Sequence, residues 1–149
     1  MNQAGENGAK LETAKQKFYD FVRIQAIEAN MLSREDEKNI LSQGITKFDL
    51  NFNDAHGVFL SAVAERNIAL ASDADHHIEA FFEQMMKRGK ISKKHFEDAV
   101  SIYKRLTNGR VPDADIRKRA KEIMLEHEWR PRGTRFVALP GSRRWFNKI

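Results

Sequence analysis

Apolar side chains recur every three or four residues along most of the chain, which is the spacing of one face of an α-helix. The first such stretch covers about 9–31. A second begins at Ser33, whose hydroxyl can cap a helix while Asp36, three residues later, bonds back to the cap. Gly44 is placed to end this second helix, because glycine tolerates the backbone conformation that often follows a last helical turn.

The same spacing predicts four further helices. Their apolar positions lie within 52–63, 72–86, 96–106 and 116–124. Pro112 is compatible with the last of them because it falls in the first turn, where a missing N–H costs nothing. Up to about residue 128 the sequence therefore predicts an all-α, single-domain bundle of about six helices joined by short loops.

Three short segments, GITKFDL, GKISKKHF and GRVPDADI, share one local design. Each contains a glycine, then a β-branched residue, then another apolar residue five positions further on. This is the spacing of a hydrophobic staple, in which the residue before the helix cap packs on the first helical turn. The expected pairs are Ile45 with Leu50, Ile91 with Phe96, and Val111 with Ile116.

The end of the chain departs from this helical pattern. Prolines and glycines interrupt it, and the pair Pro140-Gly141 is typical of a turn. We therefore expect three regions: a frayed N-terminus at 1–8, a helical domain at 9–128, and a non-helical C-terminal strap at 129–149 that packs on the helices.

Positive charge is concentrated in this strap. The chain has 26 basic and 21 acidic residues, a formal net charge of +5. The strap contains five arginines and one lysine without an acid, so the rest of the chain is close to neutral at −1. Phe136, Trp145 and Phe146 lie between the arginines and are unfavourable in water. We expect these rings to pack on the helices and the arginines to face outward.

The outward cations are the candidate binding residues. The leading hypothesis is a non-enzymatic helical module that binds an acidic surface of a protein partner through the strap, or binds through a groove between helices. The alternative is a nucleic-acid-binding protein, because arginines bind phosphates and aromatic rings stack on bases. Two lysines at a predicted helix start join the set, since positive charge there is unfavourable unless an anion is near. The candidate residues are Arg130, Arg132, Arg135, Arg143, Arg144, Lys93 and Lys94.

Neither an enzyme motif nor a complete metal site is evident. The chain has no cysteine, no Gly-x-Ser-x-Gly elbow and no glycine-rich phosphate loop. The segment SDADHHIE could place Asp73 with His77, or His76 with Glu79, on a shared divalent metal. Two ligands do not complete a site, so we assign no cofactor and leave metal binding by this segment open.

The chain also lacks the apolar core of a signal peptide and any run near the ~18 apolar residues that a membrane span requires. With no cysteine, disulfides are excluded. We expect a soluble cytoplasmic protein without membrane partners. The oligomeric state stays open.

The run from MLSREDEKNILSQGI through ISKKHFEDAVSIYKRL, residues 31–106, resembles the TerB-like helical domains associated with tellurite resistance and some J-domain proteins. The shared feature is an acidic helix start after a turn. This resemblance implies a helical fold and, as a second alternative function, a metal-linked stress protein. The family's acidic metal motif has Asp-Gly before the helix, where this chain has Ala29-Asn30.

Overall fold

The computed structural model describes residues 3–133 and 144–149 of the chain. Within these ranges it contains seven helices and one two-stranded parallel sheet, so the all-α class is confirmed. The chain divides into two compact units, Met1–Leu70 and Ala71–Ile149, called unit 1 and unit 2 below. The sequence predicts one helical domain over 9–128; in the structure each unit builds its own cluster of buried apolar side chains.

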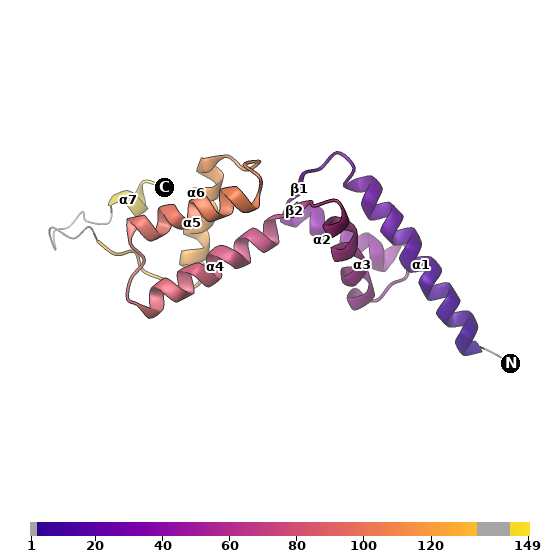
Figure 1. The fold of residues 1–149 in the computed structure, drawn as a ribbon. Helices are drawn as coiled ribbons and strands as arrows, with labels where there is room; N and C mark the ends of the chain where they lie inside the picture. Colours follow the sequence, from indigo (N-terminus) through magenta and orange to yellow (C-terminus); the bar gives the residue numbers. More distant parts are fainter. Residues whose placement is uncertain (1–2, 134–143) are drawn as a thin grey trace. The chain divides into compact units, whose positions relative to one another are not determined.

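Unit 1 holds three helices and the short sheet (Figure 1). Its elements in chain order are α1 (Gln3–Gln25), β1 (Met31–Leu32), α2 (Arg34–Thr46), α3 (Phe52–Glu65) and β2 (Ala69–Leu70). α1 and α2 both pack against α3. The buried rings of Phe18 and Phe59 lie in the core of this unit.

α1 differs from its prediction at both ends. Residues 3–8, expected to be frayed, are helical, although all of their side chains are exposed. The helix ends at Gln25 instead of near residue 31. The reason is long-range pairing: Met31 aligns with Ala69 in the parallel sheet, and a strand residue is unavailable to a helix.

Gly44 lies inside α2, which corrects its prediction as the end of this helix. α2 continues to Thr46, and the helix is closed by the backbone N–H of Lys47, which donates to the carbonyl of Gln43. A Cβ on Gly44 would lie 2.7 Å from Cζ of the buried Phe18 ring. Glycine is therefore required so that the Phe18 ring can lie against the backbone of α2, and not for a turn.

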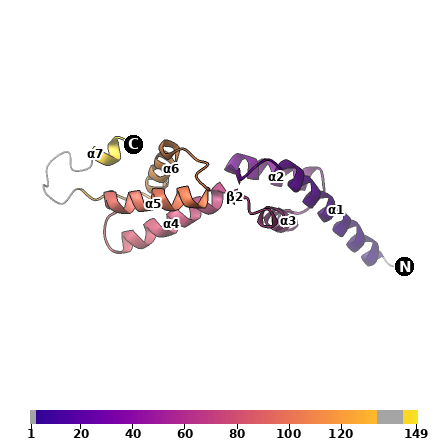
Figure 2. The ribbon, with the colours of Figure 1, turned by 45° about the horizontal axis from the view of Figure 1, so that its top comes forward.

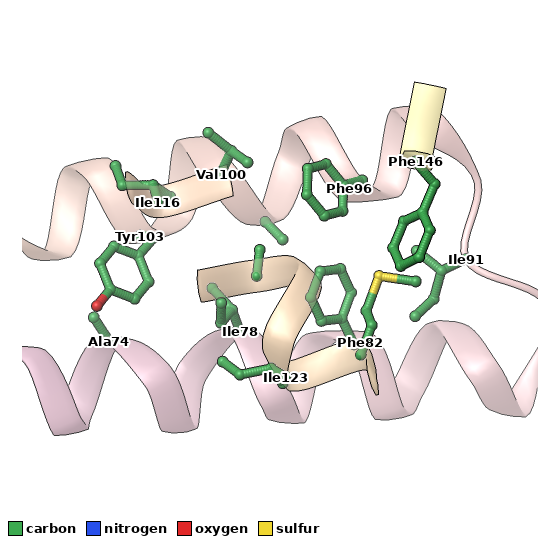
Figure 3. Close-up of a cluster of buried hydrophobic side chains, with 13 residues drawn as sticks. Ala74, Ile78, Phe82, Ile91, Phe96, Val100, Tyr103, Ile116, Ile123 and Phe146 are labelled. Carbon is green, nitrogen blue, oxygen red and sulfur yellow. The ribbon is translucent and has the colours of Figure 1, made fainter. Parts of the chain in front are cut away.

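Unit 2 holds α4 (Ala71–Lys87), α5 (Lys93–Leu106), α6 (Asp113–Glu126) and α7 (Arg144–Asn147). α4 and α5 lie side by side in the views of Figures 1 and 2, and α6 packs against both. Figure 3 shows Phe82 of α4, Phe96 of α5 and Ile123 of α6 pointing into a shared core, and all three are buried.

The staple pattern is present at two of its three predicted positions. Ser92 caps α5 between the buried side chains of Ile91 and Phe96. Pro112 occupies the cap position of α6, between Val111 and Ile116. These two pairs have the predicted spacing around a helix start.

The third predicted pair, Ile45 with Leu50, is wrong, because Ile45 lies inside the preceding helix. Ile45 is an exposed residue of α2, and α3 is capped by Asn51, whose side chain accepts from the backbone N–H of Asp54. The residues that flank this cap at staple spacing are Leu50 and Ala55, both buried. The prediction failed because it treated Gly44 as a helix end.

Candidate functional site

A short backbone contact joins the start of the predicted strap to the start of α5. Ile91 and Pro131 form an isolated parallel bridge, and the backbone N–H of Arg132 donates to the carbonyl of Ile91 over 2.6 Å. Both Ile91 and Pro131 are buried. The bridge therefore fixes Arg130 and Arg132 beside the first turn of α5, which begins with Lys93 and Lys94.

The C-terminal turn is fixed at the same end of the unit. The sequence predicts no helix in the strap, whereas Arg144–Asn147 form one helical turn, α7. Trp145 donates from its indole Nε1 to the carbonyl of Arg132 over 3.4 Å, and its ring lies 5.4 Å from that of Phe96. These contacts place Arg144 near Arg132.

Phe146 anchors α7 in the core. Its side chain is 6% exposed and points toward Phe82 and Ile91 in Figure 3. Lys121 of α6 covers the outer side of this contact, with its Nζ 5.0 Å from the ring centroid and 3.3 Å from the carbonyl oxygen of Ile149. An aromatic ring and a cation thus hold the end of the chain against α6.

Eight exposed cations lie on these connected segments, and we call them the basic end. They come from the end of α4, the α4–α5 turn, the first turn of α5, the Ile91 bridge and α7. The members are Lys87, Arg88, Lys90, Lys93, Lys94, Arg130, Arg132 and Arg144. Five of the seven predicted binding residues are among them; Arg135 and Arg143 lie outside the described residues, as do Phe136 and the Pro140-Gly141 pair.

Most of the basic end lacks a local counter-charge. Lys94 pairs with Asp98 over 3.2 Å and Lys87 with Glu83 over 3.9 Å. Within residues 3–133 and 144–149, the other six cations form no ion pair. Their charge is therefore available to an external anion.

The nearby acid Glu97 is already committed to another partner. Arg117 of α6 donates two hydrogen bonds to its carboxylate, 2.7 and 2.6 Å long. This bidentate contact holds the pKa of Glu97 below its ordinary value of 4.5, and Lys93 adds only a weaker attraction. Glu97 ties α5 to α6 and leaves the charge of Lys93 largely uncompensated.

The first turn of α5 adds its own positive potential. Ser92 accepts from the backbone N–H of His95, and its own N–H donates to His95 Nδ1 over 3.4 Å. The cap satisfies two backbone donors without contributing negative charge, in contrast to a capping glutamate. The helix dipole and the two lysines therefore act in the same direction.

The tryptophans have structural contacts that occupy their rings. Trp129 stacks on His127 at 4.3 Å and meets Phe82 edge-on at 6.3 Å. Trp145 contacts Phe96 and Phe146 at 5.4 and 5.6 Å. Rings engaged in this way are poorly placed to stack on unpaired bases, although the cations beside them are exposed.

The acidic and histidine segment at the start of α4 is organised by polar contacts between side chains. Asp75 is 1% exposed and receives Nε of Arg119 at 3.1 Å. Glu79 lies 2.8 Å from Nε2 of His127 and 3.7 Å from Nδ1 of His76. In the part of the chain that the structure describes, no group of three or more potential ligands could hold a metal ion. These contacts instead connect α4 with α6 and the residues just after it.

No family model, curated protein or solved structure matched this chain. The resemblance to TerB-like domains therefore stays a prediction. Among the described residues, no helix has both the length and the apolar character needed to cross a bilayer. The basic end is the site that the geometry defines best.

What the sequence missed is the meeting of two separate basic segments. Lys87, Arg88 and Lys90 are explained in sequence terms by a helix end or a solvated turn. Only the bridge between Ile91 and Pro131 brings the segment just after them next to the segment that carries Arg130 and Arg132. The staple spacing around Ser92 marks Ile91 as buried, but nothing in its local sequence names Pro131 as its neighbour.

Proposed function

We propose that this protein is a non-enzymatic interaction module that binds an acidic surface of a protein partner through its basic end. The single observation that supports this most strongly is the Ile91–Pro131 bridge, which gathers cations from residues forty positions apart. Six of these cations have no acidic partner within the described ranges, so an incoming carboxylate surface meets no competing internal ion pair.

The arrangement also favours specificity. The segments that carry the cations are held by a cap, a backbone bridge and the buried Phe146, so their backbones are ordered before binding. Pre-ordering lowers the entropy cost of association. Four of the eight cations are arginines, and arginine forms planar two-point contacts with carboxylates.

Nucleic acid is the competing ligand, and the ring contacts of Trp129 and Trp145 favour the protein partner. Binding of single strands relies on ring faces open to bases. Here both indoles pack on neighbouring rings. Binding of a nucleic-acid duplex through its phosphates alone is compatible with this surface. The experiment below therefore distinguishes duplex binding from binding of a protein partner.

The test is affinity capture from native lysate with two charge-neutralising variants. Lys93→Gln with Lys94→Gln should reduce capture of the specific partner at least fivefold, the effect of about 1 kcal/mol lost at a charged contact. The free energy of unfolding of this double variant should stay within about 0.5 kcal/mol of the wild-type value. Removing two positive charges from the N-terminus of α5 is favourable for the helix dipole, and this gain offsets the lost ion pair between Lys94 and Asp98. Once the partner is purified, a binding titration with the wild-type protein and with the Lys93→Gln, Lys94→Gln variant measures the two dissociation constants directly.

The matched control is Arg110→Gln with Lys118→Gln, two exposed cations of unit 2 that are not in the basic end. This control should capture the partner normally. Equal capture by all forms would overturn the role of the basic end. Loss of the partner after nuclease treatment, together with retention of a short duplex DNA at physiological salt, would replace the protein partner with nucleic acid.

A further inference from the structure

Unit 1 contains a pocket between α1 and the end of α2, and none of its lining residues belongs to the basic end. Its volume is about 300 Å³. The lining residues are Lys10, Thr13, Ala14, Lys17, Lys47 and Phe48. Half of them are lysines and none is acidic, although unit 1 as a whole has more acidic than basic residues.

The lysines of α1 fall into two groups with different surroundings. Lys15 faces α3, where its Nζ lies 3.0 Å from Asp54 and 3.6 Å from Glu12. Asp54 accounts for most of the rise in the pKa of Lys15 above its ordinary value. Lys10 and Lys17 face the pocket and form no ion pair with any residue in 3–133 or 144–149. Of these three lysines, Lys15 is therefore paired with acids, whereas Lys10 and Lys17 lie around the pocket, unpaired within the described part of the chain.

Ordinary surface chemistry explains only part of this arrangement. Lys47 closes α2, where a cation complements the helix dipole, and its Nζ lies 2.9 Å from Oε1 of Gln43. No comparable explanation applies to Lys10 and Lys17. They lie seven residues apart, roughly 10 Å along the helix, so that Lys47 approaches the space between them from another element.

The wall of the pocket is apolar and fixed. Phe48 is half-buried, and its ring lies 5.4 Å from Phe18 and 5.5 Å from Phe21. Ala14 lines the pocket without filling it. A ligand therefore meets a flat aromatic group held by the core and three flexible ammonium groups around it.

We propose that this pocket binds a small phosphorylated molecule that carries an aromatic ring, such as a nucleoside diphosphate. Lysine binds phosphate as a mobile point charge, and three lysines match two adjacent phosphate groups. Phe48 supplies an apolar contact for the ring. The volume lies at the lower end of the range typical of small-molecule sites. The site is in unit 1 and is independent of the proposed function of the basic end.

Titration of the full-length ¹⁵N-labelled protein with adenosine diphosphate, pyrophosphate and adenosine tests this proposal. Adenosine diphosphate should shift the amide resonances of Thr13, Lys17 and Phe48, with a dissociation constant on the order of 1 mM. Pyrophosphate should bind more weakly at the same residues. Adenosine alone should produce no shift at about 10 mM.

Two variants and a control assign the contacts. Lys17→Gln should weaken the diphosphate about fivefold, whereas Lys38→Gln, an exposed lysine of α2 outside the pocket, should change nothing. Phe48→Leu should reduce adenosine diphosphate to the affinity of pyrophosphate without weakening pyrophosphate itself. An unchanged far-UV circular dichroism spectrum is the control that each variant is folded.

Several results would overturn the proposal. One is the absence of shifts around Lys17 with either phosphate compound at about 10 mM. Another is a response confined to amides of the basic end, such as Lys93, which indicates general anion binding by unit 2. Equal weakening by Lys17→Gln and Lys38→Gln, or equal affinity of the wild-type protein for the two phosphate compounds, also contradicts the assigned site.

Discussion

The two units differ in how they present charge and apolar surface. Unit 1 has 8 basic and 10 acidic residues, a net charge of −2, whereas unit 2 has 18 basic and 11 acidic residues, a net charge of +7. Among the described residues, six of the seven exposed large apolar side chains belong to unit 1. Almost all of the excess in unit 2 comes from residues 129–149, which contribute +6, so the remainder of both units is close to neutral.

The difference shows how one chain can separate two surface chemistries. In unit 2, three large aromatic residues after residue 128 that the structure describes are packed at least partly on the core, and the cations beside them stay outside. In unit 1, three lysines and the ring of Phe48 line a pocket. In unit 2 the exposed cations lie on several connected segments, whereas in unit 1 three lysines line one pocket.

The largest expected effect distinguishes a buried aromatic of unit 2 from an exposed one of unit 1. Phe146→Ala should lower the free energy of unfolding of unit 2 by about 3 kcal/mol, because a ring that is 6% exposed is removed from the core. Phe52→Ala, at 56% exposed, should change stability by less than about 0.5 kcal/mol. Both tryptophans, Trp129 and Trp145, lie in unit 2, so their fluorescence in urea reports that unit.

If Phe146→Ala left the urea midpoint of the tryptophan signal unchanged, α7 would not be part of the core. A large loss from Phe52→Ala would instead show that α3 is covered in solution by something other than unit 1.

The next effect compares two glycines in helices of unit 1. Gly44→Ala should destabilise this unit by about 2 kcal/mol, because the new methyl group would overlap the buried Phe18 ring. Gly57→Ala should stabilise it by roughly 0.5–1 kcal/mol, because that site has no atom within 4 Å and alanine favours a helix. Far-UV circular dichroism during denaturation measures both. The same sign of change at the two positions would contradict the contact between the Phe18 ring and Gly44.

A smaller effect, present in both units, is loss of stability in acid. Hydrogen bonds from the Ser33 side chain and backbone hold the pKa of Asp36 below its ordinary value of 3.8. Hydrogen bonds from Arg117 hold the pKa of Glu97 below its ordinary value of 4.5. Each carboxylate contributes stability above its unfolded pKa and loses it as the pH falls through its folded pKa.

Unfolding free energies between pH 6 and about pH 3 test this. Asp36→Asn should reduce the pH dependence of unit 1, and Glu97→Gln that of unit 2, each by about 0.5 kcal/mol as for exposed pairs. A steeper acid loss in either variant is the contrary result.

The smallest effect concerns the first turns of α1. Removing residues 1–8 should change the unfolding free energy of unit 1 by less than about 0.5 kcal/mol, because the described part, 3–8, is exposed along its whole length. A thermal melt followed at 222 nm is sufficient. A marked fall in the melting temperature would mean that these residues make contacts in solution.

Local signals predicted well wherever the decisive interaction spans a few residues. The capping box of Ser33 with Asp36 and the staple of Ile91 with Phe96 both appear as expected, because a cap and a first helical turn are specified within six positions. Gly44 misled because its role depends on Phe18, which is distant in sequence. A glycine that ends a helix and a glycine that admits a ring look alike in sequence.

The sequence selects candidate residues one at a time and does not show which of them lie on neighbouring segments. The sequence selected Arg130, Arg132 and Arg144 from charge asymmetry, and Lys93 and Lys94 from their unfavourable place at a helix start. It offered no reason to place the two sets together. It also gave no sign that Lys10, Lys17 and Lys47 share a pocket, because they belong to two different helical ends.

By itself, the sequence determined the helical class, most helix starts and the excess of positive charge near the C-terminus, since hydrophobic period, caps and composition act locally. Only the tertiary structure decided that the chain forms two cores, that Gly44 receives a ring, and that Ile91 pairs with Pro131. These outcomes depend on which distant segments bury each other's apolar groups and satisfy each other's backbone bonds. That choice is made by the whole packed unit, so no single stretch of residues contains it.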